Sequence, residues 1–152
     1  MSLFGVQIPV SSIHVIPAGT SKADALDILV GAVARTGATT DRDALQQAVH
    51  EREAVMSTGI GGGVAIPHVR IPQVRCASIA VGVAPDGIEY GTLDNSPVHI
   101  LVLFAMPEGA DKEYLRLLAQ VMAALKNTAV YERLVACRTP EEVHAVLEGN
   151  PV

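Results

Sequence analysis

Hydrophobic residues in the first third of the chain recur every three or four positions, which is typical of amphipathic helices. The first such stretch follows Ser21, a predicted N-cap, and stops at Gly37. The second begins after Asp41 and runs to Met56. An apolar piece at residues 13–16 precedes both helices and is typical of an edge strand. The sequence therefore predicts one short strand followed by two helices.

Short apolar runs, typical of strands, replace this pattern in the middle of the chain. Residues 64–66 form one run, which Pro67 is expected to end. Residues 77–84 form a second run, and the Pro-Asp-Gly sequence at 85–87 predicts a turn before a short piece at residues 88–90. Residues 98–106 are almost all apolar, as expected of a strand that is covered on both faces.

Helical spacing returns in the last third. The clearest helix covers residues 112–126, and a shorter one is expected at 129–136. A capping box at residues 139–142, with Pro140 at the first helical position, begins the last helix. Helices, then strands, then helices predict an α/β fold, with residues 1–152 forming a single domain that has a mixed central β-sheet flanked by helices.

Composition excludes several classes of function. Apolar residues make up 49% of the chain and charged residues 18%, as in a globular domain. A net charge of −5 and only 3% aromatic residues argue against a nucleic-acid partner. We expect a cytoplasmic protein without direct membrane insertion, because the chain shows no signal-peptide pattern and no apolar run long enough to span a bilayer. Residues 1–75 hold six basic and six acidic residues, a balance that tolerates an anionic ligand.

Metal and redox sites are not expected. Cys76 and Cys137 are far apart and neither belongs to a Cys-x-x-Cys pair, so two buried free thiols are the simplest interpretation. The histidines do not cluster as metal ligands do. His99, at the entry of a buried strand, is expected to be a hydrogen-bonded structural residue.

The segment REAVMSTGIGGGVAIPHVR, residues 52–70, carries the most informative chemistry. It places His68 directly after a short strand, beside a glycine-rich turn and two arginines. An ordinary imidazole is mostly neutral at pH 7 and is then a good nucleophile. Glycine-rich turns expose N–H groups that can bind an anion, and arginine recognises phosphate with two hydrogen bonds. These features together are compatible with an anionic ligand, such as a phosphoryl group, beside His68.

Two features of this segment also have plainer interpretations. The glycine run is neither a P-loop, since no Gly-Lys-Ser/Thr follows, nor a dinucleotide fingerprint, since it follows a helix and precedes a strand. By itself it indicates only a tight turn. Arg52 has a plain alternative as well, a salt bridge at the helix end with Glu51 or Glu53.

As a whole, the segment resembles the signature of type-2 enzyme IIA domains of the bacterial phosphotransferase system, the class of fructose, mannitol and nitrogen-regulatory IIA. The family pattern is Arg-Glu, then Ser-Thr-Gly-Ile-Gly-x-Gly, a short apolar strand and Pro-His. The chain has the matching residues in the same order: Arg52-Glu53, residues 57–63, residues 64–66 and Pro67-His68. The turn at residues 93–98 and Met106-Pro107 are similar too, and the resemblance covers about residues 15–147.

The resemblance implies that His68 accepts a phosphoryl group from the phosphocarrier HPr. It would pass the group to a IIB protein or keep it as a mark that regulatory target proteins recognise, with no metal and no organic cofactor. One ring nitrogen would attack phosphorus while the other donates a hydrogen bond that fixes the tautomer, and positioning would supply most of the catalysis. Arg52 is the expected catalytic arginine. The phosphate is expected to be bound by Thr58, Gly59, Gly61, Gly63 and Arg70.

One position departs from the family. Tyr114 stands where the family has its second site histidine, and a tyrosine can donate a hydrogen bond but not a positive charge. Its hydroxyl is expected to point toward His68. Donor docking is expected on apolar surface at the glycine turn, with Ile60 and Val69 as contacts.

Three functional interpretations remain open at this stage. The protein is a phosphoryl relay, a regulatory binding module whose associations phosphorylation at His68 controls, or a degenerate member that no longer accepts phosphate. A free-standing chain and the presence of Tyr114 favour the nitrogen-regulatory branch.

Overall fold

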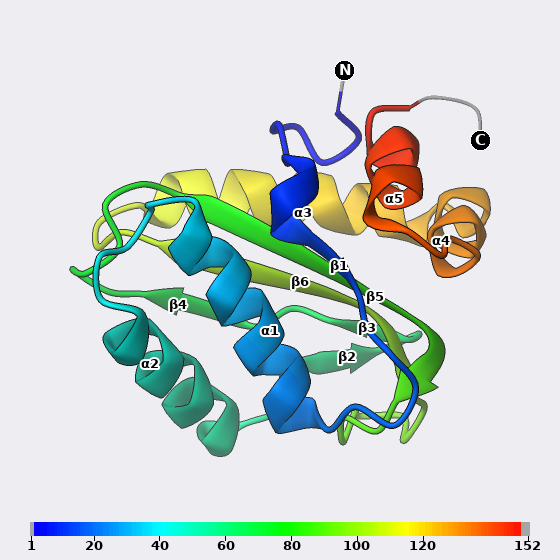
Figure 1. The fold of residues 1–152 in the computed structure, drawn as a ribbon, viewed down its shortest axis with the longest axis horizontal. Coiled ribbons are helices and arrows are strands. Elements are labelled where there is room, and N and C mark those ends of the chain that lie inside the picture. The colour runs from blue at the N-terminus through cyan, green and yellow to red at the C-terminus, as the bar shows by residue number, and fades with distance from the viewer. Residues whose placement is uncertain (1, 150–152) are drawn as a thin grey trace.

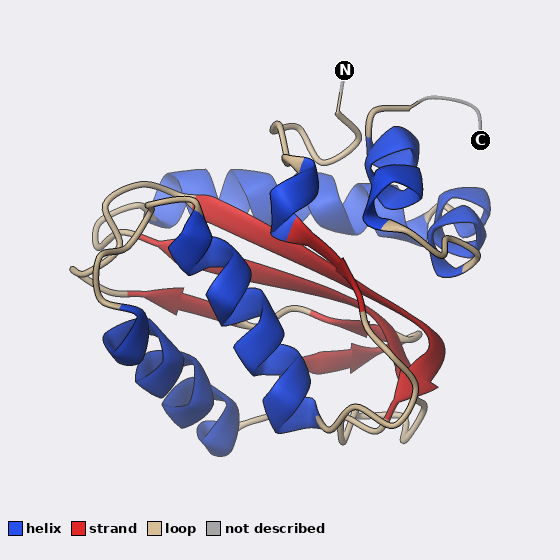
Figure 2. Cartoon of the chain, viewed as in Figure 1, coloured by secondary structure: helices blue, strands red, loops and turns tan. Residues whose placement is uncertain are grey.

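The computed structural model describes residues 2–149, which form one six-stranded mixed sheet with helices on both faces (Figures 1 and 2). Five strands lie in the order β1 (Ile13–Val15), β5 (Ser78–Ile88), β6 (Val98–Met106), β3 (Val64–Ala65) and β2 (Gly59–Gly61). The sixth strand, β4 (His68–Arg70), pairs with β6 further along the chain from β3. The predicted α/β fold with a mixed sheet and the predicted edge strand at β1 are confirmed.

The helices divide between the two faces of the sheet (Figure 1). One face is covered by α1 (Lys22–Arg35) and α2 (Arg42–Val55). The other is covered by α3 (Asp111–Lys126), α4 (Thr128–Val135) and α5 (Pro140–Leu147), with a short 3-10 helix, η1 (Val10–Ser12), before β1.

The predicted helix starts are confirmed by their caps. Side-chain oxygens of Ser21, Asp41 and Thr139 each accept a hydrogen bond from the backbone N–H three residues later. Each bond satisfies an N–H group that the helix itself leaves free, which stabilises a helix by about 1 kcal/mol.

Strand β6 lies between two hydrophobic clusters. Leu101, Leu103 and Ala105 pack toward α1 and α2, whereas the alternate residues Ile100 and Phe104 pack toward α3 and the C-terminal helices. All five side chains are fully buried. The nearly continuous apolar run in the sequence follows from this burial on both faces.

The turn predicted at residues 85–87 is wrong. Strand β5 continues through it to Ile88, which still pairs with Val98 on β6, and the register shifts between Val83 and Ile88. The extra residues bulge from the strand because pairing with β6 resumes beyond them, and Gly87 takes a positive φ of 77° there.

Two predictions at the glycine-rich segment also differ from the structure. Gly59–Gly61 is not only a turn but a short strand that pairs with β3, with Gly61 at a φ of 89° where the register shifts. Pro67 does not end the pairing with β6, because its carbonyl accepts a hydrogen bond from Phe104 N and the chain continues as β4. A proline lacks only the donor, so a strand can resume after it.

The two cysteines are both free thiols. Cys137 is buried as predicted, but Cys76 is exposed in the loop before β5, so the prediction of two buried thiols is wrong for Cys76.

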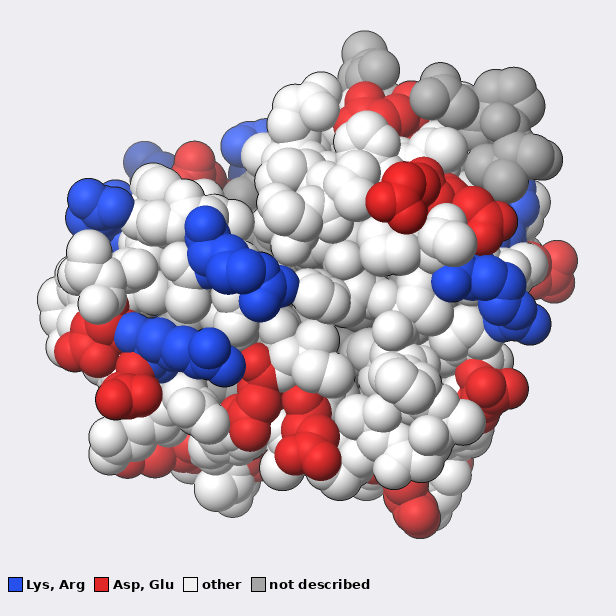
Figure 3. Space-filling view, in the orientation of Figure 1, with Lys and Arg blue, Asp and Glu red and all other residues white. Residues whose placement is uncertain are grey.

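Figure 3 shows basic and acidic side chains side by side on the face covered by α1 and α2, consistent with the even charge balance of residues 1–75. Within residues 2–149, no helix is both long and apolar enough to cross a membrane.

Candidate functional site

His68 is the first residue of β4 and lies in an open depression. Its backbone pairs with Phe104 on β6, and its side chain is partly exposed. The depression has a volume of about 380 Å³, and the residues that line it come from α2, from β4 and from Ile71: Ala48, Glu51, Arg52, Val55, His68, Val69, Arg70 and Ile71. The side chain of His68 is therefore accessible from solvent.

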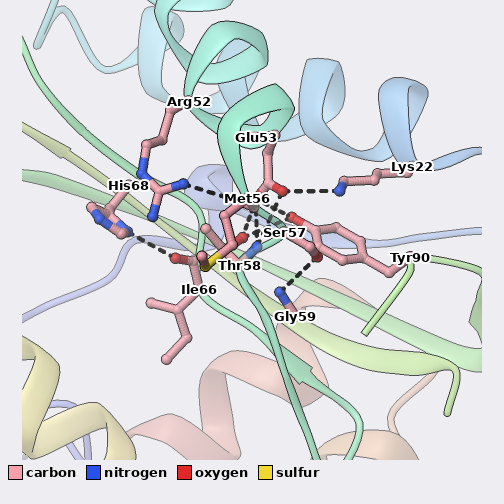
Figure 4. Close-up of polar contacts among 10 residues, drawn as sticks. All are labelled: Lys22, Arg52, Glu53, Met56, Ser57, Thr58, Gly59, Ile66, His68 and Tyr90. Carbon is pink, nitrogen blue, oxygen red and sulfur yellow. Dashed lines mark hydrogen bonds and ion pairs between the residues drawn. The ribbon is translucent and has the colours of Figure 1, made fainter. Parts of the chain in front are cut away.

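The protonation of the His68 ring follows from one hydrogen bond. Nδ1 lies 3.1 Å from the carbonyl oxygen of Ile66 (Figure 4). A carbonyl can only accept, so Nδ1 carries the proton and donates it, and the lone pair is on Nε2. Figure 4 shows the rest of the ring turned away from Ile66. Ile66 is itself held by a 3.0 Å bond from its N–H to the carbonyl of Thr58.

Tyr114, in the first turn of α3, contacts His68 through its ring. The two ring centroids are 5.2 Å apart and the planes differ by 27°, while the ring of Phe104 meets Tyr114 edge-on at 5.5 Å. Burial raises the pKa of Tyr114, although Arg70 and Arg52 act in the opposite direction. Tyr114 is therefore a neutral group at pH 7. That its hydroxyl points at His68 stays a prediction.

Two arginines lie at the same depression as His68. Arg52, in the last turn of α2, donates from Nη1 to the carbonyl of Met56 at 2.9 Å and so fixes the end of that helix. Arg70 stands two residues after His68, and alternate residues of a strand share a face. Its guanidinium carbon lies 6.0 Å from the Tyr114 ring centroid, and it forms an ion pair with Asp111, the first residue of α3.

Glu53 has a role that sequence reasoning missed. The residue is 8% exposed, and its carboxylate accepts hydrogen bonds from Thr58 N and Oγ1, from Tyr90 at 2.7 Å and from Lys22 at 2.9 Å (Figure 4). Burial by itself raises the pKa of Glu53, but the bonds from Thr58, Lys22 and Tyr90 outweigh it and lower the pKa overall. The alternative of a salt bridge from Arg52 to Glu51 or Glu53 is wrong, since Arg52 pairs with neither among residues 2–149 and Lys22 is the ion-pair partner of Glu53.

Glu53 and its partners Lys22, Thr58 and Tyr90, here called the Glu53 cluster, connect Arg52 to the segment that holds His68. Glu53 is next to Arg52 on α2, and Thr58 leads into β2 and bonds Ile66 through its carbonyl. Arg52 and the acceptor for His68 are thus tied to one buried carboxylate. The only sequence signal for it was the Arg-Glu pair of the motif.

Two residues expected to bind phosphate have other partners. The hydroxyl of Thr58 is buried and donates to Glu53, with Tyr90 also within 3.0 Å. The N–H of Gly59 donates to Ser57 Oγ at 3.1 Å. Neither group is presented to the His68 depression in this arrangement.

Gly61 and Gly63 lie at the other end of β3. The carbonyl of Gly63 accepts from His99 N and Ile100 N on β6. His68 pairs with Phe104 on the same strand, which at about 3.3 Å per residue puts Gly63 roughly 16 Å further along. The structure therefore does not bring these glycines to His68, and their role in phosphate binding stays an unsupported prediction.

An internal carboxylate already occupies the glycine turn. Asp94 Oδ2 accepts from the N–H of Gly62 at 3.0 Å. Hydrogen bonds from Ser96, Gly62 and Thr92 hold the pKa of Asp94 well below its usual range, so it is charged. The Gly62 N–H group of this turn therefore binds a carboxylate of the protein itself.

The remaining sequence expectations can be placed directly. His99 Nδ1 lies 2.9 Å from the carbonyl of Ala84, which confirms its structural role. Ile60 is 43% exposed, whereas Val69 lines the depression but is only 7% exposed, so it offers little surface to a donor and its contact stays a prediction. Among the described residues, no group of three His, Cys, Asp or Glu side chains is placed to hold a metal ion.

Comparisons with known proteins agree on one family. Residues 8–150 match the family described as phosphoenolpyruvate-dependent sugar phosphotransferase system, EIIA 2. The chain is 33% identical over 129 residues to the nitrogen regulatory protein of Pseudomonas aeruginosa, covering 85% of this chain and 84% of that protein. It is 32% identical over 129 residues to the fructose-specific EIIABC component of Bacillus subtilis, covering 85% of this chain but only 20% of that longer protein.

Solved structures show the same fold. The crystal structure of nitrogen regulatory protein IIA-Ntr from Neisseria meningitidis superposes with a TM-score of 0.83 at 28% identity, covering 96% of this chain and 99% of that one. IIA mannitol from Escherichia coli superposes with a TM-score of 0.79 at 19% identity, covering 93% of this chain and 99% of that one, which shows likeness of fold alone.

Proposed function

Because the chain belongs to the EIIA type-2 family of the phosphoenolpyruvate-dependent sugar phosphotransferase system, we propose that His68 accepts a phosphoryl group as a covalent phosphohistidine. The bond from Nδ1 to the Ile66 carbonyl carries this proposal. It leaves the lone pair on Nε2, in a side chain that lines an open depression. A nucleophile with a fixed tautomer and access from solvent is what phosphoryl acceptance requires.

The transfer involves one bond formed and one broken. Nε2 attacks phosphorus as the bond from phosphorus to the donor nitrogen breaks, and that electron pair stays on the donor imidazole. By family resemblance the donor is phospho-HPr. Nδ1 keeps its proton throughout, so the phosphorylated ring carries positive charge, which the Ile66 carbonyl stabilises. The transition state is loose, so positioning and charge stabilisation supply most of the catalysis.

Arg52 and Arg70 supply positive charge to the phosphoryl oxygens. Two unit charges about 4 Å apart attract by about 4 kcal/mol at an effective dielectric of about 20. Tyr114 cannot add a charge in place of the family's second histidine, but its stacked ring restricts the His68 imidazole. The two arginines therefore carry the electrostatic part of the work.

A nitrogen-regulatory role is favoured over sugar transport. The chain is 33% identical to the Pseudomonas nitrogen regulatory protein and 28% identical to a fructose-specific EIIA component of Haloferax volcanii, and each match covers more than four fifths of both proteins, so the higher identity supports the regulatory role. Another solved neighbour is a complex of a mannitol IIA with its phosphorylated IIB. Here the onward partner is a IIB protein or a regulatory target, and the alternative is a binding module that acts without phosphoryl relay.

A reconstituted reaction tests the proposal. The chain is incubated with labelled phosphoenolpyruvate, enzyme I and HPr. We expect acid-labile label in the wild type and in His50→Ala, a histidine paired with Asp27 away from the site, and none in His68→Ala. Acid lability separates phosphohistidine from phosphate on Ser57 or Thr58. Label that persists in His68→Ala would contradict the proposal, and no label on the wild type would favour a degenerate member that no longer accepts phosphate.

A further inference from the structure

Arg70 is held by a carboxylate although it stands next to the nucleophile. His68 and Arg70 share one face of β4, with their Cα atoms about 7 Å apart. The Arg70 guanidinium is within 6.0 Å of the Tyr114 ring, which in turn stacks on His68. Its ion-pair partner is Asp111, on the N-terminus of α3. Rotation of the Arg70 side chain can therefore move its guanidinium from Asp111 toward His68.

This ion pair is of the kind that a stronger anion displaces. The side chains of Arg70 and Asp111 are 46% and 65% exposed, and exposed pairs contribute little to stability. A phosphoryl group brings a charge of about −1.5 to −2 and three acceptor oxygens, which match the fork of a guanidinium. Asp111 loses little when released, because a carboxylate at the start of a helix is favoured by the helix dipole.

We propose that Asp111 holds Arg70 away from His68 in the unphosphorylated protein and that Arg70 exchanges Asp111 for the phosphoryl group when His68 is phosphorylated. Asp111 is then a positioning residue, which acts on the reaction through Arg70. The inference rests on the proposed phosphorylation of His68 and assigns that site a built-in competitor.

The exchange also changes the surface that a partner meets. It releases the Asp111 carboxylate at the start of α3, where Leu115 is 61% exposed. Val55, which lines the depression from α2, is 82% exposed. A protein that docks on these apolar side chains meets a paired Asp111 in one state and a free carboxylate in the other. The two phosphorylation states therefore differ in charge beyond the phosphoryl group itself.

A matched pair of variants tests the exchange. Asp111→Asn removes the competitor, whereas Glu113→Gln removes one negative charge from an exposed residue in the same helical turn. The measured quantity is the equilibrium of phosphoryl transfer between HPr and the full chain. We expect Asp111→Asn to shift it toward phospho-His68 by about fivefold, which is about 1 kcal/mol, and Glu113→Gln by less than about twofold.

The same substitutions in an Arg70→Gln background show whether Asp111 acts through Arg70. There Asp111→Asn should have no more effect than Glu113→Gln. The side-chain Nε–H signal of Arg70 should move on phosphorylation in the wild type and stay fixed when His68 is replaced by alanine. Equal shifts in Asp111→Asn and Glu113→Gln, or a full Asp111→Asn effect without Arg70, would overturn the exchange. Absence of label from His68 in the wild type would instead overturn the proposed function.

Discussion

The ring of Tyr114 stacks on the ring of His68, with centroids 5.2 Å apart and planes that differ by 27°. This contact places α3 against the proposed nucleophile, at the position where the family resemblance implies a second histidine. The partner of His68 is therefore aromatic and neutral, and the positive charge at the site comes from Arg52 and Arg70.

Removal of the Tyr114 ring should slow phosphoryl transfer more than removal of its hydroxyl. An aromatic pair contributes about 0.5–1.5 kcal/mol, so Tyr114→Ala should lower the transfer rate from HPr by up to about tenfold. Tyr114→Phe keeps the stack and should lose less than about threefold. Single-turnover rates for both variants are the measurement. A tenfold loss in Tyr114→Phe alone would show that the hydroxyl contacts the phosphoryl group instead.

Arg52 should be required for rate and not for folding. Within residues 2–149 it donates only to the carbonyl of Met56 at the helix end, so Arg52→Gln should cost little stability. Loss of a charged donor to a phosphoryl transition state typically costs about 10²-fold in rate. Arg75→Gln is the control, since Arg75 bonds the carbonyl of Gly37 and does not line the depression. Equal rates for the two variants would remove Arg52 from the mechanism.

The helix caps at Ser21, Asp41 and Thr139 were predictable from sequence because a cap joins an oxygen to an N–H only three residues away. The central strand was predictable because burial on both faces leaves a continuous apolar run. The bulge between Val83 and Ile88 was not, because its register depends on pairing with β6, which no local pattern encodes.

The site divides in the same way. His68 and Arg52 were identified through the motif, and Tyr114 only through family resemblance, since it is distant in sequence. The glycines were expected at the site through the same family resemblance and lie near His68 in sequence, whereas β2 and β3 extend away from it, so their role in phosphate binding stays a prediction. Burial of Glu53 depends on donors from distant elements, and a charged residue in a sequence gives no sign of them.

The Glu53 cluster should make the free energy of unfolding fall at acidic pH. The folded-state pKa of Glu53 is lowered from the ordinary 4.5, so its contribution is fully present above about pH 4.5 and is lost as the pH falls through the lower folded value. Glu53→Gln should cost about 2 kcal/mol at pH 7, since bonds to a charged group contribute about 1.5–3 kcal/mol each.

Denaturant unfolding of Glu53→Gln at pH 7 and pH 3 checks this, with Glu51→Gln, an exposed residue of the same helix, as the control. The difference from wild type should shrink at pH 3. A difference that is constant with pH would mean that Glu53 acts through packing alone.

Gly61→Ala should destabilise the protein without slowing phosphoryl transfer. Gly61 has a φ of 89°, and a Cβ there would lie 3.1 Å from Asp94 Oδ2. A non-glycine residue in this region costs about 1–2 kcal/mol. Gly91→Ala is the matched variant, because Gly91 has a φ of 76° and the same backbone cost but open space around its Cβ position, so the difference between the two variants reports the contact with Asp94. A tenfold slower transfer in a folded Gly61→Ala protein would instead show that the glycine turn takes part in phosphate binding.

The central claim is that the Nδ1–Ile66 bond directs phosphorylation to the other ring nitrogen. Long-range ¹H–¹⁵N correlation spectra of the chain, phosphorylated by HPr, identify which nitrogen of His68 carries phosphorus. The account predicts phosphorus on Nε2, with Nδ1 protonated both before and after transfer. Phosphorus on Nδ1, or an unphosphorylated ring protonated on Nε2, would contradict it.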